Sequence, residues 1–134
     1  IKNSYNIANI SGNSKVGGII GHVCPYVKQV GYEFLYNCYS IGSITGSQYI
    51  DTIAGFADYL TFDYMYTIKS IYDKVGDGSW NNATGSNWEP LADSSAKSTM
   101  LTNLLKGQGA GKWTRDTTST INAGYPYLVN NVPE

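Results

Sequence analysis

The chain has 134 residues, 42% of them hydrophobic and only 14% charged, with a net charge of −1. This length predicts one domain with its own core, and the hydrophobic content argues against disorder. There is no basic run to bind nucleic acid and no apolar stretch long enough to predict a membrane span. Few charges together with abundant Gly and Tyr predict an all-β protein suited to an extracellular medium.

The first elements of the chain form a repeat. Residues 1–22 align without gaps to residues 35–56, at an offset of 34. The identical pairs are Asn3/Asn37, Tyr5/Tyr39, Ile7/Ile41, Ile10/Ile44, Gly12/Gly46, Ile19/Ile53 and Gly21/Gly55. A weaker third start lies at residues 68–73, where Ile68 and Tyr72 match Leu35 and Tyr39. Self-similarity at a fixed period is typical of repeat architectures.

Each unit contains two β-like runs, residues 1–11 and 16–23, with copies at 35–45 and 50–57. Gly12 and Gly46 separate the runs, where a tight bend requires a positive φ or no side chain. Ile7 and Ile10 have opposite parity, so we expect a bend or bulge that turns both inward. The aromatic segments 24–34 and 58–67 are irregular and predict a third strand with a loop.

After residue 75 the repeat pattern ends. Residues 76–87 have the composition of a loop. Residues 94–106 predict the only helix, capped by Ser98 or a nearby Ser, with an apolar stripe that includes Met100 and Leu104. Residues 113–116 and 121–129 predict closing strands around a Pro turn.

Stacking explains why a chain would repeat such a unit. A single unit cannot bury its own apolar side chains, whereas stacked units pair their strands in parallel and align like residues in ladders. We therefore expect Ile7 over Ile41, Ile10 over Ile44, and Asn3 over Asn37 as an amide ladder. Tyr5 is expected over Tyr39 and Tyr72. The helix at 98–106 is expected to cover the C-terminal end of the stack.

These residues carry a family likeness. The text IKNSYNIANISG…VGGIIG (1–21) and LYNCYSIGSITG…IDTIAG (35–55) resembles the GLUG-motif repeat of bacterial surface proteins. The segments IKSIYDK (68–74), TMLTNLLK (99–106) and WTRD…INAGYPYL (113–128) resemble the tail that ends such arrays. One departure is that Gly17-Gly18 becomes Asp51-Thr52 in the second copy, which puts a close backbone approach there in doubt.

The resemblance implies a right-handed parallel β-helix, or β-solenoid, of about two to three turns, in a protein that is secreted or attached to the cell wall. Residues 1–75 would be the repeats, and residues 76–134 a C-terminal loop, helix and capping strands of the same domain. The chain begins inside a repeat with no initiator Met, which predicts a fragment of a longer protein. The resemblance brings no catalytic residue and no cofactor.

The predicted function is therefore a non-catalytic structural or adhesive module that displays Tyr-rich loops to a host or cell-surface protein or glycan. Tyr26, Tyr32, Tyr59 and Tyr64 are the candidate ligand-binding residues, because Tyr on loops supplies rigid contact surface. The alternatives are a carbohydrate-binding module, or an accessory domain of a secreted peptidase or glycosidase whose active site lies elsewhere. The alternative is that these tyrosines pack over the ends and corners of the coil, which explains most aromatic residues in most domains.

Other polar residues are weaker candidates. Asp73, Asp77 and Asn81 have part of the spacing of a calcium loop, but Val75 occupies a ligand position and Thr84 replaces the bidentate Glu. His22 is the only histidine, and its counterpart is Phe56, which favours a packing position over catalysis. Cys24 and Cys38 could form a disulfide, although two separate thiols packed in the interior are the preferred interpretation.

Overall fold

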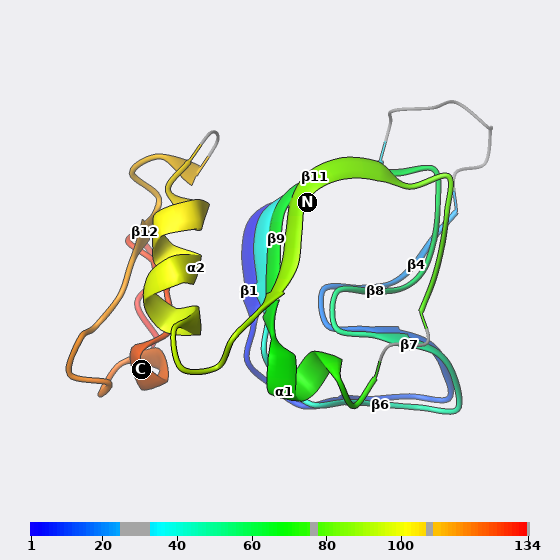
Figure 1. Ribbon diagram of the computed structural model, residues 1–134, viewed down its shortest axis with the longest axis horizontal. Coiled ribbons are helices and arrows are strands. Elements are labelled where there is room, and N and C mark those ends of the chain that lie inside the picture. The colour runs from blue at the N-terminus through cyan, green and yellow to red at the C-terminus, as the bar shows by residue number, and fades with distance from the viewer. Residues whose placement is uncertain (25–32, 76–77, 107–108, 134) are drawn as a thin grey trace.

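The computed structural model describes residues 1–24, 33–75, 78–106 and 109–133. The protein is mostly β, as the composition predicts, and its strands lie in tiers, each tier stacked on the one before (Figure 1). The first tier contains β1 (Lys2–Asn6), β2 (Ile10–Ser11), β3 (Ser14–Gly17) and β4 (Ile20–Val23). The second contains β5 (Glu33–Ser40), β6 (Ile44–Thr45), β7 (Gln48–Asp51) and β8 (Ala54–Asp58).

The third tier contains β9 (Leu60–Ile68), the short helix α1 (Lys69–Tyr72) and β10 (Ser79–Asn81), and β11 (Thr84–Leu91) lies on the fourth. The C-terminal part consists of α2 (Ala96–Leu104), β12 (Trp113–Thr114), the 3-10 helix η2 (Asn122–Gly124) and β13 (Tyr127–Leu128).

All pairings between tiers are parallel. The strands β1, β5, β9 and β11 form a four-stranded sheet in that order, and β4, β8 and β10 form a three-stranded one. Two-stranded pairs β2–β6 and β3–β7 lie between these sheets. The first two tiers keep the offset of 34 throughout, as in the pairs Tyr5 with Tyr39 and Ile10 with Ile44. The predicted parallel pairing of residues 1–11 with 35–45 is therefore confirmed.

The third tier begins earlier than the sequence comparison predicted. Tyr39 pairs with Tyr66, whereas Tyr72, expected beneath Tyr39, ends helix α1. The lengths of the connections explain this difference. Residues 24–32 join β4 to β5, whereas Tyr59 alone joins β8 to β9. The segment 58–67, expected to hold a third strand with a loop, consequently forms most of the strand β9, without the loop.

The stack also extends past the expected boundary at residue 75. Residues 76–87 have the composition of a loop, yet they contain β10 and the start of β11. These strands form because their backbone groups pair with β8 and β9, as in Trp80 with Ala57 and Trp88 with Met65. Tertiary hydrogen bonding here overrides a local preference for turns.

A residue in the left-handed backbone conformation recurs in every strand of the four-stranded sheet. Asn37, in the middle of β5, has a φ of 53° and so adopts the left-handed conformation that Asn tolerates better than most residues. The residues at the same level of the neighbouring strands are Asn3 (φ 49°), Tyr64 (φ 54°) and Asn87 (φ 54°). Two shorter ladders of the same kind are Lys15 with Tyr49 and Tyr59 with Asn82.

These left-handed residues reverse the alternation of side chains along each strand. Leu35 and Cys38 differ in parity but both contribute to one core, whereas Tyr39 faces the other side of the sheet. We call the first the inner core, and its buried members are Val23, Leu35, Cys38, Ile53, Ala54, Ala57, Leu60 and Met65. The outer core consists of Tyr39, Tyr66, Ile68, Leu91, Ala96, Met100, Leu104 and Trp113. The sheet is thus apolar on both faces.

The expected inward turn of Ile7 and Ile10 is wrong in detail. Ile7 is 46% exposed, and its counterpart Ile41 packs at the margin of the outer core. Ile44, the counterpart of Ile10, is buried. The alternation of side chains reverses inside the strand and not between Ile7 and Ile10. The two isoleucines therefore keep opposite orientations.

Close packing, and not a positive φ, requires the glycines at the bends. A Cβ atom at Gly46 would lie 2.9 Å from the carbonyl oxygen of Gly12, and one at Gly18 would lie 2.0 Å from Ser40 Oγ. The second tier replaces Gly17-Gly18 by a different device, in which the buried Asp51 carboxylate accepts a hydrogen bond from the backbone N–H of Ile53 (3.0 Å).

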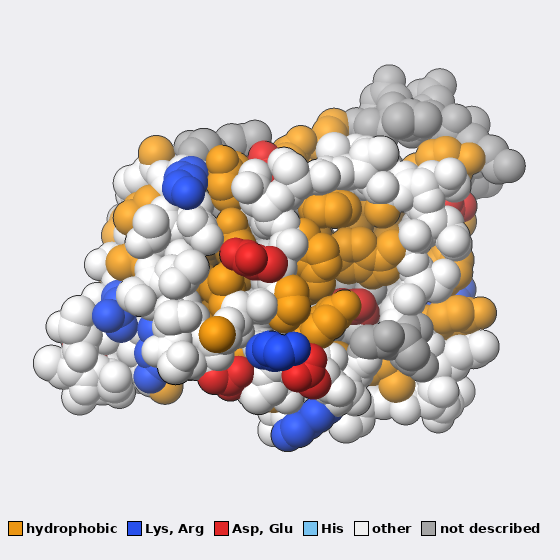
Figure 2. Space-filling view, in the orientation of Figure 1, with side chains coloured by type: hydrophobic (Ala, Val, Ile, Leu, Met, Phe, Trp, Pro, Cys, Tyr) orange, Lys and Arg blue, Asp and Glu red, His pale blue; other side chains and the backbone are white. Residues whose placement is uncertain are grey.

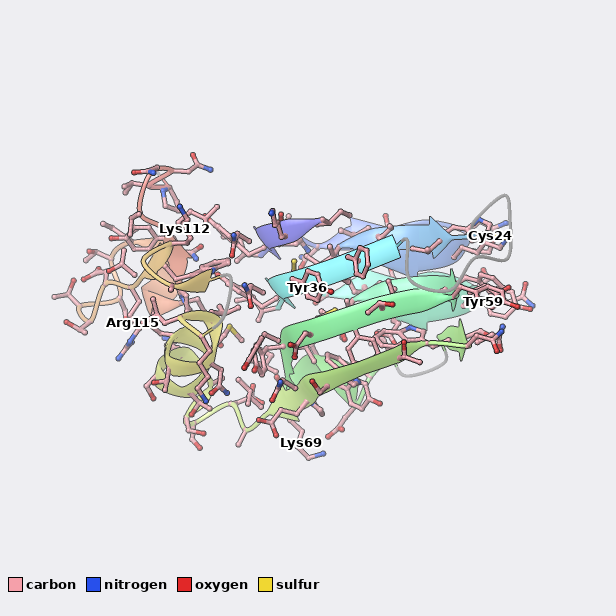
Figure 3. The ribbon with its side chains drawn as sticks, turned by 90° about the horizontal axis from the view of Figure 1, so that it is seen from above. Cys24, Tyr36, Tyr59, Lys69, Lys112 and Arg115 are labelled. Carbon is pink, nitrogen blue, oxygen red and sulfur yellow. The ribbon has the colours of Figure 1, made fainter. Side chains whose placement is uncertain are left out.

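Helix α2 covers the side of the stack and not its end. Ala96, Met100 and Leu104 face the outer core, and Figure 3 shows the C-terminal part beside the stacked strands. The predicted helix at 94–106 is confirmed at 96–104; no side chain caps it, and α1 and η2 are additional helical segments. The closing strands are shorter than expected, with β12 antiparallel to β13. The lateral position follows from the apolar outer face of the sheet.

A buried tyrosine ties the C-terminal part to the stack. The Tyr39 hydroxyl donates to the carbonyl oxygen of Pro126 and accepts from Asn122 Nδ2 at 2.9 Å. Burial raises the pKa of Tyr39 far above its ordinary value, so the hydroxyl stays protonated and able to donate. Across the sheet, Trp113 Nε1 donates to Asn3 Oδ1 at 3.3 Å, which joins β12 to the first tier.

We predict that Tyr39→Phe lowers the free energy of unfolding by about 0.5–1.5 kcal/mol, because the Pro126 carbonyl and the Asn122 amide lose the hydroxyl but keep the hydrogen bond of 3.0 Å that joins them. Urea unfolding followed by tryptophan fluorescence measures the change. The control, Tyr36→Phe, alters a half-buried ring and should cost less than about 0.5 kcal/mol. Equal effects of the two variants would contradict the proposed role of the hydroxyl.

Candidate functional site

The two described tyrosines of those expected on display loops occupy left-handed backbone positions in the stack instead. Tyr59 forms the bend between β8 and β9 with a φ of 57°, at the edge of the strands in Figure 3. Tyr64 is the left-handed residue of β9 and packs partly buried against the outer core. Tyr26 and Tyr32 lie outside the described residues. The two described candidates are therefore positioned by the turn geometry of the stack and do not extend into a loop.

The calcium-loop candidates have other partners. The exposed Asp73 carboxylate forms an ion pair with Lys69 Nζ at 3.0 Å, and Asn81 Nδ2 donates to Ser79 Oγ at 3.5 Å within β10. Asp77 lies outside the described residues. Across the parts of the chain that the structure describes, no group of three or more His, Cys, Asp or Glu side chains is arranged to hold a metal ion.

His22 and the cysteines occupy packing and surface positions. The exposed His22 ring meets Phe56 edge-on at 5.1 Å, so the predicted packing position is a ring contact on the surface and not a buried one. Both cysteines are free; Cys38 is buried, and burial raises the pKa of its thiol to about 11. Cys24 is exposed, so the expectation of two interior thiols holds for Cys38 only.

An aromatic strip crosses the outer face of the sheet where α2 does not cover it. Phe34 and Tyr36 follow each other on one side of β5, with nearly parallel rings 5.6 Å apart. Tyr36 pairs with Lys2 of β1 on one side and with Asp63 of β9 on the other. Lys2, Phe34 and Tyr36, together with Ile1, border a hollow of about 350 Å³. We call Lys2, Phe34, Tyr36 and Asp63 the outer strip.

The carboxylate of the outer strip is held in place by its neighbours. Asp63 accepts hydrogen bonds from Ser86 Oγ at 3.0 Å and from Asn87 Nδ2 at 2.7 Å. Phe34 remains 42% exposed. Stacked rings beside a cation and an oriented carboxylate can bind a ligand that has an apolar face and hydroxyl groups. The alternation of Phe34, Leu35 and Tyr36 was the sequence signal for this strip, and the sequence analysis did not use it.

A second aromatic group closes the inner core at the last tier. Trp80 and Trp88 lie 5.7 Å apart between ring centres, with Tyr72 against Trp88 at 5.9 Å and Phe62 against Trp80 at 5.5 Å. Trp80 Nε1 donates to the carbonyl oxygen of Ala54 at 2.7 Å, which fixes its ring. Figure 2 shows hydrophobic side chains gathered inside the curve of β11.

The titratable groups with lowered pKa belong to structural turns. Hydrogen bonds from the hydroxyls of Thr120 and Thr118, and from the N–H groups of Ile121 and Thr118, hold the pKa of Asp116 well below its usual range. The side chain and N–H of Ser70 likewise lower the pKa of Asp93. These carboxylates organise the backbone of their turns.

No family model, curated protein or solved structure matches this chain. Among the described residues, no helix has both the length and the apolar character needed to cross a membrane.

We predict that the Asp116 turn makes stability fall in acid. Because the folded pKa is below the unfolded value, its contribution is complete above about pH 5 and is lost as the pH falls through about 4 and below. Asp116→Asn should lower the melting temperature at pH 7 and reduce its dependence on pH between 5 and 2. The control Asp73→Asn breaks only an exposed ion pair and should change the melting temperature little. An unchanged acid profile in Asp116→Asn would contradict this role.

Proposed function

We propose that the chain is a non-catalytic structural module of an extracellular bacterial surface protein, built as part of a right-handed parallel β-helix. The observation that carries the proposal is the parallel pairing of the first two tiers in one register, with the offset of 34 kept in all four strands of the unit. Such a unit can be added or removed without changing its neighbours, which is the property a stalk or display scaffold needs.

The bonds that fix the corners suit an extracellular medium. Asn6 Oδ1 accepts from the N–H of Ala8, and Asn9 Oδ1 accepts from the N–H of Ser43 on the next tier, both at 3.0 Å. These are neutral hydrogen bonds, which salt screens far less than ion pairs. Together with the low charge content they support a scaffold that tolerates changes of ionic strength.

We predict that a second copy of residues 1–34, inserted before residue 35, adds one tier in register. The longer protein should unfold in one transition with a larger urea m-value, because more surface becomes exposed on unfolding. A matched insert that lacks Ser4 shifts the register of β1 by one residue, which turns every following side chain to the opposite face. This insert should not increase the m-value. A separate transition for the full insert, or an unchanged m-value, would contradict the modular stack.

A second candidate function, carbohydrate binding, is favoured by the outer strip. Sugar rings stack on aromatic side chains, and carboxylates orient their hydroxyl groups. Phe34, Tyr36 and Asp63 supply these groups on one rigid sheet, and the order of these positions is set by strand pairing and not by a loop.

We predict that, if this second function holds, the protein binds at least one class of glycan on an array, and that Phe34→Ala weakens that binding at least tenfold. Val129→Ala removes a comparably exposed apolar side chain in the C-terminal part and should leave binding unchanged. Calorimetry with the best glycan measures both variants. Failure to bind any glycan would remove carbohydrate binding as a function and leave the scaffold proposal intact.

A further inference from the structure

Among the residues that the structure describes, the pairs β2–β6 and β3–β7 have no counterpart on the third tier. The next described strand after α1 is β10, which pairs with β8, and no described strand pairs with β6 on the side opposite β2. Figure 1 shows β6 and β7 turning in a hairpin that the third tier does not repeat. One side of this hairpin therefore keeps an open strand edge.

The backbone of β6 has hydrogen-bonding groups on that open side. The carbonyl oxygens of Ser43 and Thr45 accept from the N–H groups of Ile10 (2.8 Å) and Gly12 (3.1 Å) on the first tier. Alternate residues of a parallel strand direct their N–H and C=O groups to opposite sides. Ile44 and Gly46 therefore direct theirs away from β2.

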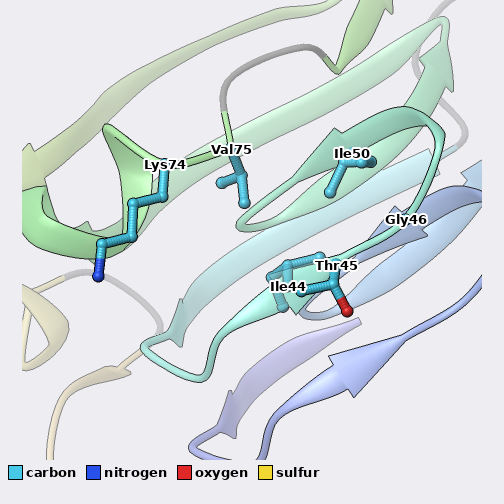
Figure 4. A pocket seen from close by; sticks show the side chains of 6 residues that line it. All are labelled: Ile44, Thr45, Gly46, Ile50, Lys74 and Val75. Atoms are coloured by element: carbon cyan, nitrogen blue, oxygen red, sulfur yellow. The ribbon is translucent and has the colours of Figure 1, made fainter.

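A cavity of about 360 Å³ lies against this edge. Figure 4 shows that Ile44, Thr45 and Gly46 form one side and Val75 the other, with Ile50 and Lys74 completing the lining. A smaller hollow of about 210 Å³ continues along Ser43 and Ile71. Lys74 is exposed beside Ile44 and supplies the positive charge of the lining.

The repeat itself indicates which strand fits. The edge of β2 has the sequence Ile10-Ser11-Gly12, and it is filled by β6 with the sequence Ile44-Thr45-Gly46 in parallel. Glycine must lie over glycine here, because a Cβ at Gly46 would approach the carbonyl oxygen of Gly12 to 2.9 Å. A strand that is added to the open side of β6 would likewise need a glycine opposite Gly46.

We propose that the open edge of β6 binds an extended segment of a partner protein with the pattern Ile-Ser/Thr-Gly. The segment adds in parallel, as β6 adds to β2, and its backbone bonds the free groups of Ile44 and Gly46. Its Ile enters the cavity between Ile44 and Val75. An acidic residue directly before that Ile lies near Lys74 and strengthens binding.

Fluorescence anisotropy with labelled synthetic peptides tests this proposal on the whole chain. The probe has the sequence of residues 41–52, and the matched control peptide contains Gly46→Val. We expect saturable binding of the probe and at least tenfold weaker binding of the control. A second probe with Ser43→Asp should bind more tightly than the first, and high salt should abolish the difference.

Variants of the protein test whether the peptide binds in this cavity. Val75→Trp fills the cavity and should weaken both probes at least tenfold, whereas Val129→Trp should not. If Val75→Trp lowers the melting temperature, the exposed Lys74→Glu serves instead, and it should remove the preference for the Ser43→Asp probe. Equal binding of the Gly46→Val peptide, or full binding by both cavity variants, would overturn the proposal. Self-association of the protein that Val75→Trp abolishes would also overturn it, by making a second copy the occupant.

Discussion

The parallel pairing of each tier with the next is the constraint on which the rest of the structure depends. Strands of two to nine residues cannot satisfy their backbone groups alone, so each takes its hydrogen bonds from the equivalent strand of the neighbouring tier. This arrangement forces like conformations to lie over one another. The left-handed residues therefore recur level by level, with Asn at three of the four positions and the costlier Tyr64 at the fourth.

Those left-handed residues explain the C-terminal part. Because they reverse the side-chain alternation within one strand, Leu35 and Cys38 enter the inner core while Tyr39 and Tyr66 face outward. An outward row of buried aromatics needs a cover, and α2 with Trp113 supplies it. The hydroxyl of Tyr39, bonded to Pro126 and Asn122, then fixes that cover to the sheet. A polar residue in place of either tyrosine would reduce the apolar surface on which α2 docks.

The proposed binding surfaces lie where the repeat is incomplete. In the described part of the third tier no strand pairs with β6, which leaves an open edge beside Val75 and Lys74. The outer strip lies where α2 does not reach, so Phe34 and Tyr36 remain accessible. At the last tier Trp80 and Trp88 close the inner core in place of another set of strands. A scaffold with such gaps can carry binding surfaces while its stacked interior stays unchanged.

The repeat, its offset of 34 and the β class follow from the sequence alone, because identical residues at a fixed spacing pair in one register. The residue range of α2 also follows from the sequence, through its apolar stripe, but its place beside the stack does not. The level at which Tyr66 or Trp88 enters the stack does not follow from the repeat, since connection lengths such as the single residue Tyr59 change the offset. The left-handed conformations of Tyr59 and Tyr64 and the ion pair of Asp73 with Lys69 could not be read from the sequence either. Those positions were decided by the tertiary structure, because hydrogen bonding between tiers outweighs the local preferences of Gly, Asn and Asp for loops.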